Sequence, residues 1–337
     1  MKKLLVFCLL VFVVFSGFAG GAKQSSAANT KEANLLFYYP LPFPFFDLLK
    51  VGIDAWQKDN PGIKLAVEIG PDAQTNSEID KVNALVAAKN YNGIAIYALP
   101  GVNGFFEELT KRGINIVNYA GDSSTSNPKG QDTTASFYVG TDIWQAAYDN
   151  ATVVIDVMGG KGTLLHILEV LTDPNTVIRQ EAVMRACKDR GVTYKEVAGV
   201  ETIDQATQKA TDILSANPDA QGIVTFGMLS TQGLVSVLNG LNRKIYAVTA
   251  DTEVPTLDAI RSGVIYGTVS ENPTAMAYIS LEILKQMADG AKPRSGKYTV
   301  STGTVLVTKD NITSYEKDIQ ALTQKIKDSL LTEYLIK

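Results

Sequence analysis

Histidine and cysteine are almost absent from this chain of 337 residues, which has one histidine and two cysteines. Zinc and similar metals are held by several histidine and cysteine side chains together, so a metal site of that type is excluded. A Ser-His-Asp triad would have to use His166, and no Gly-x-Ser-x-Gly turn accompanies it. His166 lies within the apolar run of residues 163–168, which is typical of a core residue. We therefore predict a protein without catalytic or metal-binding residues.

Basic blocks and phosphate loops are also missing. The formal net charge is −4, and no cluster of lysine and arginine stands out, which argues against nucleic acid as a partner. Residues 159–163 are rich in glycine, but they lack the Walker spacing and precede a strand instead of a helix. A turn is the better interpretation, and no cofactor is predicted.

Long apolar runs are absent except at the N-terminus. Lys2 and Lys3 precede an apolar run over residues 4–15 and then small residues, the layout of a secretory signal peptide. The run is too short to span a bilayer comfortably. Cleavage is expected after Ala22 or within residues 25–28, which makes residues 1–28 a signal and processing region. Gly21 stands where a lipid-anchored form would need cysteine, so we predict a soluble periplasmic protein.

The two cysteines do not predict a disulfide. Cys8 would leave with the signal peptide, and Cys187 would then stand alone. Its apolar neighbours Val183, Met184 and Ala186 favour a small buried residue, since a reactive thiol needs an exposed, electropositive setting.

Strands and helices alternate along the rest of the chain. A first strand over residues 35–39 ends at three prolines, and Phe43, Phe45 and Phe46 crowd the loop and helix that follow. Roughly five strands precede residue 142 and five follow it, with a helix after most of them. This pattern predicts an α/β fold with two parallel sheets of ordinary size, because one sheet of ten strands would be unusually large.

Polar side chains follow several of the predicted strands. Ligands of open α/β sheets bind at the carboxyl ends of the strands. Carboxylates accept hydrogen bonds from hydroxyl groups, and a guanidinium offers five donors in a rigid fork. Aromatic faces can cover the apolar side of a sugar ring. The candidates are Asn118, Asp122, Asp142, Asp251 and Glu271 at strand ends, and Arg179 in the first turns of a helix.

Each candidate also has a structural interpretation. Asp142 and Asp251 could cap helices, and Asn118 and Asp122 could be turn residues. Arg179 could be a solvated helix residue, and Glu271 could shape the turn before Asn272-Pro273. Their shared placement at one class of strand end favours binding.

The residues resemble a known family, the type I periplasmic solute-binding proteins of ABC importers, which includes ribose-, galactose- and allose-binding proteins. The resemblance runs from about residue 35 to residue 311, and the order and spacing of its motifs carry it. These motifs are Pro44-Phe45-Phe46, residues 138–142, Arg179 within residues 177–182, residues 217–220, Ala250-Asp251, Glu271-Asn272-Pro273 and residues 305–311.

The resemblance implies two Rossmann-like lobes with parallel sheets, joined by a hinge of three crossings, with the ligand between them. The crossings are expected near Thr141, Asn272 and residues 296–300. The lobes are then residues 34–141 with 273–296, and residues 142–271 with 300–312, followed by a C-terminal helix in residues 313–337. Sugar-binding members place phenylalanines at Phe45 and Phe46, an arginine at Arg179, an aspartate at Asp251 and an amide or acid at Glu271.

The chain departs from this pattern at four places. Ala120-Gly121 replace a frequent Asp-Arg pair, with Asp122 just beyond, and Gly227 and Phe43 stand where ligand-binding asparagines often lie. Gln205 aligns with a position that is often aromatic. Fewer polar groups lead us to expect a deoxy sugar, a smaller polyol or a less polar molecule.

The leading hypothesis is a monomeric exported receptor that closes over a sugar-like solute and delivers it to the membrane permease of an ABC transporter. Two alternatives are a ligand sensor for a membrane signalling receptor and an exported enzyme with Asp251 and Glu271 as paired carboxylates. A DNA-binding repressor is disfavoured, because an export signal stands where its helix-turn-helix would lie.

Overall fold

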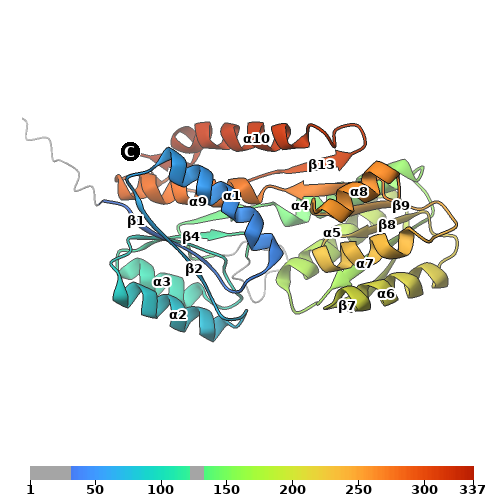
Figure 1. Cartoon of the computed structure of the whole chain (residues 1–337), viewed down its shortest axis with the longest axis horizontal. Helices are drawn as coiled ribbons and strands as arrows, with labels where there is room; N and C mark the ends of the chain where they lie inside the picture. Colours follow the sequence, from blue (N-terminus) through green and yellow to red (C-terminus); the bar gives the residue numbers. More distant parts are fainter. Residues whose placement is uncertain (1–31, 122–132) are drawn as a thin grey trace, which may run out of the picture.

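The computed structural model describes residues 32–121 and 133–337. The expected export signal and the candidate Asp122 lie outside these residues. Two six-stranded sheets form two lobes that lie side by side (Figure 1). Helices and strands alternate through both, which confirms the predicted α/β class.

The first lobe is built on a sheet of six parallel strands in the order β12-β5-β4-β3-β1-β2. The strands are β1 (Asn34–Tyr39), β2 (Lys64–Ile69), β3 (Gly93–Ile96), β4 (Asn115–Tyr119), β5 (Phe137–Gly140) and β12 (Thr299–Ser301). The helices α2 (Thr75–Ala88) and α3 (Asn103–Lys111) pack on one face, and α1 (Pro44–Asp59) and α9 (Pro273–Ala288) pack on the other. Apolar side chains fill both layers because each strand of a doubly covered sheet is buried on two sides.

The second lobe has the strand order β13-β10-β9-β8-β6-β7. Its strands are β6 (Thr163–Glu169), β7 (Thr193–Val200), β8 (Gly222–Thr225), β9 (Tyr246–Ala250), β10 (Gly267–Glu271) and β13 (Thr304–Thr308). Only β13 is antiparallel to its neighbour. The helices are α4 (Ile143–Val157) and α5 (Pro174–Arg190) on one face, with α6 (Ile203–Ala216), α7 (Met228–Leu238) and α8 (Val254–Ser262) on the other.

The chain passes between the sheets three times. It crosses after β5, after β10, and between β12 and β13. The third crossing falls later than the expected residues 296–300, because Val300 pairs with Val139 in the first sheet. That short strand carries too little hydrophobic pattern to be read from the sequence.

A C-terminal segment extends along both lobes, as Figure 1 shows. It consists of α10 (Tyr315–Ser329), a π-helical turn η1 (Leu330–Tyr334) and β14 (Leu335–Ile336), which pairs with β11 (Lys292–Pro293). Tyr315 packs into the core of the second lobe, whereas Ile326, Leu330 and Leu335 pack into the core of the first. The segment therefore contacts both lobes in addition to the three crossings.

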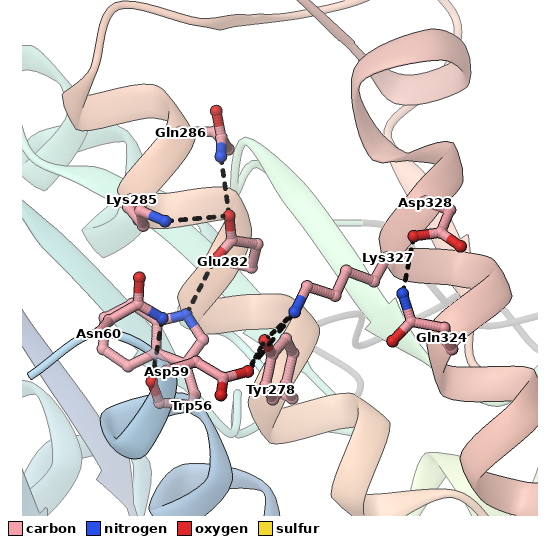
Figure 2. Close-up of polar contacts among 10 residues, drawn as sticks. All are labelled: Trp56, Asp59, Asn60, Tyr278, Glu282, Lys285, Gln286, Gln324, Lys327 and Asp328. Carbon is pink, nitrogen blue, oxygen red and sulfur yellow. Dashed lines mark hydrogen bonds and ion pairs between the residues drawn. The ribbon is translucent and has the colours of Figure 1, made fainter.

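Polar contacts attach α10 to the first lobe (Figure 2). The hydroxyl of Tyr278 donates to Asp59 at 2.7 Å, and Lys327 on α10 contacts both residues. Beneath them the indole N–H of Trp56 donates to the carboxylate of Glu282 at 3.0 Å. Because Trp56 and Glu282 are both buried, this bond joins α1 to α9 inside the lobe.

Two residues singled out in the sequence lie in the core. His166 is fully buried and its Nδ1 contacts the hydroxyl of Tyr194 at 3.1 Å. Burial lowers the pKa of His166 to about 3, so the ring is neutral. Cys187 is a buried free cysteine, as predicted, and burial raises its thiol pKa to about 12. No helix in the described ranges is long and apolar enough to cross a membrane.

Candidate functional site

A cavity of about 160 Å³ lies where the carboxyl ends of strands from both sheets meet. This is the edge at which open α/β sheets bind ligands. The first lobe contributes aromatic and small residues, namely Phe43, Phe45, Phe46, Tyr97, Ala120 and Tyr138. The second lobe contributes the charged residues Glu169, Asp173, Arg179, Asp251 and Glu271, together with Asn175, Phe226, Gly227 and Met228. Its volume is below the roughly 300 Å³ of drug-sized pockets, which suits a small ligand.

The aromatic wall forms around the start of α1. Pro44 is the first residue of α1. Proline is tolerated there because the N–H of a first helical residue makes no hydrogen bond within the helix. Phe46 stacks on Tyr39 with ring centroids 5.0 Å apart and meets Phe45 and Tyr97 edge to face at 5.5 and 5.3 Å. Phe46 is buried, whereas Phe43 is 37% exposed. The ring contacts fix Phe46, and Phe43 remains accessible to a ligand.

Arg179 and Glu271 form an ion pair across the second lobe. An Nη atom of Arg179 lies 3.2 Å from Oε1 of Glu271, and both side chains are 18% exposed. Burial by itself lowers the pKa of Arg179, but the charges of Glu271, Asp173, Glu169 and Asp251 raise it above its ordinary value. The guanidinium is therefore charged and surrounded by carboxylates.

Two cavity residues have a left-handed backbone without being glycine. They are Ala120, with φ 55°, and Asp251, with φ 71°, and no other non-glycine residue in the described ranges has positive φ. Ala120 directly follows β4, and Asp251 directly follows β9. These two strands hold the same position in the strand order of their sheets. The backbone of Asp251 is held by hydrogen bonds from its N–H to Val269 and from Thr268 Oγ1 to its carbonyl, at 2.9 and 2.7 Å. Such conformations concentrate at functional sites.

Among the acids of the cavity, Asp251 has a strongly raised pKa. Burial and the charges of Glu253 and Glu271 raise the pKa of its carboxyl well above the usual value, and Arg179 opposes them. No hydrogen bond or ion pair of its carboxylate occurs among the described residues. The described part of the chain therefore supplies no hydrogen-bond or ion-pair partner for this carboxyl group.

Glu169 and Gly227 are neighbours on the same wall. Ser230 donates to Oε1 of Glu169 at 3.4 Å and closes the first turn of α7 against the backbone of Gly227. A Cβ on Gly227 would overlap the Glu169 carboxylate. Gly227 therefore makes room for a carboxylate, and burial raises the pKa of that carboxyl.

The start of α5 adds two polar groups. Asp173 caps the helix by accepting from the N–H of Asn175 and the hydroxyl of Thr176, at 3.1 and 3.2 Å. Asn175 is 8% exposed, and its Oδ1 has no hydrogen-bond partner in the described part of the chain. An unpaired buried acceptor is costly, so Oδ1 is a strong candidate to receive a hydrogen bond from a ligand.

Seven of the eleven residues named from the sequence line this cavity: Phe43, Phe45, Phe46, Arg179, Gly227, Asp251 and Glu271. Three do not. Asn118 is buried and bonds to the backbone of Ala98 and Gly121, Asp142 is exposed and caps α4 through Gln145, and Gln205 is exposed and accepts from Glu201. All three side chains bond to local backbone groups, which the structural interpretation allowed for Asn118 and Asp142. The eleventh, Asp122, lies outside the described residues.

Sequence reasoning missed several lining residues. Glu169 directly ends a strand and could have been found by the rule applied to Asp251. Asp173 caps α5, and a cap position by itself does not indicate a ligand contact. Tyr97 and Tyr138 follow or occupy apolar strands, and nothing in the local pattern separates them from core aromatics. The wall of the second lobe is consequently more polar than expected.

A larger groove of about 660 Å³ lies between α1, α9 and α10. Asp251 and Glu271 line both the groove and the cavity. Among the described residues, no group of three His, Cys, Asp or Glu side chains is arranged to hold a metal ion.

Comparison with known proteins gives consistent matches. The family model described as "Periplasmic binding protein domain" matches residues 36–292. The D-allose-binding periplasmic protein of Escherichia coli (strain K12) is 26% identical over 292 residues, which are 84% of this chain and 91% of that protein.

Solved structures show the same fold. An ABC transporter solute binding protein from Burkholderia graminis C4D1M, in complex with D-arabinose, has a TM-score of 0.74 at 23% identity and covers 86% of this chain and 99% of its own. A periplasmic solute binding protein from Actinobacillus succinogenes 130z with bound D-allose has a TM-score of 0.72 at 18% identity, with coverage of 84% and 100%.

Proposed function

The chain belongs to the periplasmic binding protein family, and from this premise we propose that it captures a monosaccharide or similar small polyol between its lobes and delivers it to an ABC-type import permease. The observation that carries the proposal is the small cavity lined from both lobes by aromatic rings, an arginine and several acceptors. Rings cover the apolar face of a sugar, and the polar groups fix its orientation. The sugars bound by the relatives above support this ligand class.

Capture would proceed by closure of the two lobes about the three crossings. A ligand favours the closed state only through its greater affinity for that state. A ligand that contacts Phe43 on one lobe and Arg179 on the other supplies this difference. We take the lobes as residues 34–141 with 273–301 and residues 142–271 with 304–312, which moves the third boundary to follow the observed strands. Hinge closure of this kind is known for periplasmic binding proteins.

Its place in the cell follows from the same proposal. A protein that serves an import permease acts outside the inner membrane, so we propose that the chain is exported to the periplasm and acts there as a monomeric receptor. Binding, not catalysis, is the proposed role of Asp251 and Glu271.

Isothermal titration calorimetry against a panel of aldoses, deoxy sugars and polyols tests the function. We expect at least one compound to bind saturably with one site per chain. Mass spectrometry of small molecules that co-purify with the chain identifies the ligand independently. The absence of any sugar or polyol signal in both measurements would contradict the proposal.

A further inference from the structure

Hydrogen-bond acceptors outnumber donors on the charged wall of the cavity. Four carboxylates line it, from Glu169, Asp173, Asp251 and Glu271, together with the unpaired amide oxygen of Asn175. Arg179 is the only lysine, arginine or histidine among the described lining residues. A ligand that matches this wall must be rich in donors. With four acidic side chains and one basic one, the wall also has a negative formal charge, which hydroxyl groups alone do not require.

Three of the four carboxylates have partners within the protein. Glu271 pairs with Arg179, Asp173 caps α5, and Glu169 accepts from Ser230. The guanidinium of Arg179 is therefore already paired with the carboxylate of Glu271. The fourth carboxylate, that of Asp251, has no partner in the described chain. The backbone of Asp251 is left-handed, and its acidic neighbours are Glu253, Glu271 and Glu169.

The arrangement around Asp251 disfavours a second negative charge and favours a positive one. An isolated buried carboxylate is unstable unless it is paired or protonated. The opposite lobe supplies Phe43, Phe45 and Tyr97, and aromatic faces attract cations. A neutral sugar would be oriented equally well by amide side chains, without this accumulation of charge.

We propose that the ligand is a sugar or polyol that carries a protonated amine, and that Asp251, flanked by Glu169 and Glu271, is the counter-charge for that amine. Oδ1 of Asn175 accepts a further hydrogen bond from the ligand. The sugar scaffold in this inference rests on the proposed function, whereas the positive charge rests on the cavity wall alone.

The test varies scaffold and charge separately. Calorimetry at about pH 6.5, where a primary amine is still protonated, compares D-glucosamine and D-galactosamine with the parent sugars D-glucose and D-galactose. The two N-acetyl derivatives keep the nitrogen but lose the charge, and putrescine and choline keep a charge without the sugar. We expect at least one amino sugar to bind roughly tenfold or more tightly than both its parent and its N-acetyl form.

Two variants test whether the preference for the amine-bearing sugar depends on Asp251. Asp251→Asn keeps the shape and removes the charge, and it should reduce the preference for the amine to about twofold or less. Asp142→Asn, which alters an exposed carboxylate outside the cavity, should retain the full preference. Circular dichroism of both variants shows whether the fold is intact, and Glu169→Gln gives a second measurement if Asp251→Asn fails to fold.

The outcomes separate the two proposals. If neutral and amine-bearing sugars bind equally, the inference is overturned while the sugar-binding function stands. Should putrescine or choline bind while no sugar does, the positive charge is supported and the sugar scaffold is wrong. Failure of every compound to bind contradicts both.

Discussion

Arg179 illustrates how much one side chain of the cavity depends on its neighbours. It is the basic residue of the described wall, and it pairs with Glu271 at 3.2 Å inside a ring of carboxylates. Removing one member of a buried, hydrogen-bonded charge pair leaves the other without compensation, which costs about 2–5 kcal/mol. The guanidinium is therefore expected to contribute both to the ligand contact and to the order of the empty site.

Arg179→Ala should weaken binding of any ligand found in the panel by at least roughly thirtyfold, as calorimetry would measure. Arg185→Ala is the matched control. Arg185 lies on the same helix, and it forms an ion pair with Asp189 at the protein surface. Equal affinity of the two variants would show that Arg179 does not contact the ligand.

Gly227 offers a second test at the scale of one atom. Its backbone, with φ −118°, accepts any residue, so Gly227→Ala changes little except that the new Cβ displaces the Glu169 carboxylate. We expect about a tenfold loss of affinity with a small change in the unfolding midpoint. Gly104→Ala, where a Cβ meets open space, should leave affinity unaltered. If the Gly227→Ala protein bound with full affinity, Glu169 would not contribute to ligand binding.

Among the elements, α9 links the hinge to the C-terminal segment. Asn272 caps α9 by accepting from the N–H of Ala275 at 2.9 Å, and its amide donates to Thr302 and to Thr323 on α10. The residue is fully buried. One side chain thus joins two crossings and the segment that contacts both lobes, which explains why a polar residue lies in this core.

Asn272→Ala should lower the free energy of unfolding by about 2–4 kcal/mol, because it removes a cap and leaves buried groups unpaired. Asp142→Ala removes an exposed cap at the other end of the hinge and should cost about 1 kcal/mol. Urea unfolding of the two variants gives the comparison. Equal losses would mean that the bonds to Thr302 and Thr323 contribute nothing.

For the whole molecule, the stability should depend on pH through a buried acid of the first lobe. Glu78 is fully buried in the first lobe, with one oxygen accepting from the N–H of Leu99 and the other without a partner in the described chain. Burial raises the pKa of Glu78 from 4.5 to about 8, although the bond from Leu99 opposes the shift. The native state therefore binds this proton more tightly than the unfolded chain.

This stabilisation is fully present below pH 4.5 and is lost as the pH rises toward about 8. Glu78→Gln keeps the shape and cannot titrate. Between about pH 5 and pH 8, the free energy of unfolding of the native sequence should fall more than that of Glu78→Gln, by up to about 1.4 kcal/mol per pH unit. Parallel pH profiles of the two proteins would show that Glu78 remains charged.

Prediction from the sequence succeeded where local pattern and chain order carry the information. The family resemblance is confirmed by the match over residues 36–292, and the two sheets follow from strands that alternate with helices. Phe45, Asp251 and Glu271 were named because they follow strands, and Arg179 because it lies in the first turns of a helix, and the structure brings all four to one cavity. Asn118, named by the strand-end rule, and Gln205, named from the family resemblance, lie elsewhere, because their side chains bond to nearby backbone.

The amino-acid sequence by itself determined the alternation of strands and helices, and hence the edge of each sheet at which a ligand can lie, because periodicity and turn residues act over a few positions. Only the tertiary structure decided that Arg179 pairs with Glu271, that Gly227 makes room for Glu169, and that the Asp251 carboxylate has no partner among the described residues. Those pairings join residues far apart in the chain, and the charge of the cavity is their sum. It therefore depends on which side chains the two lobes bring within a few ångströms of one another.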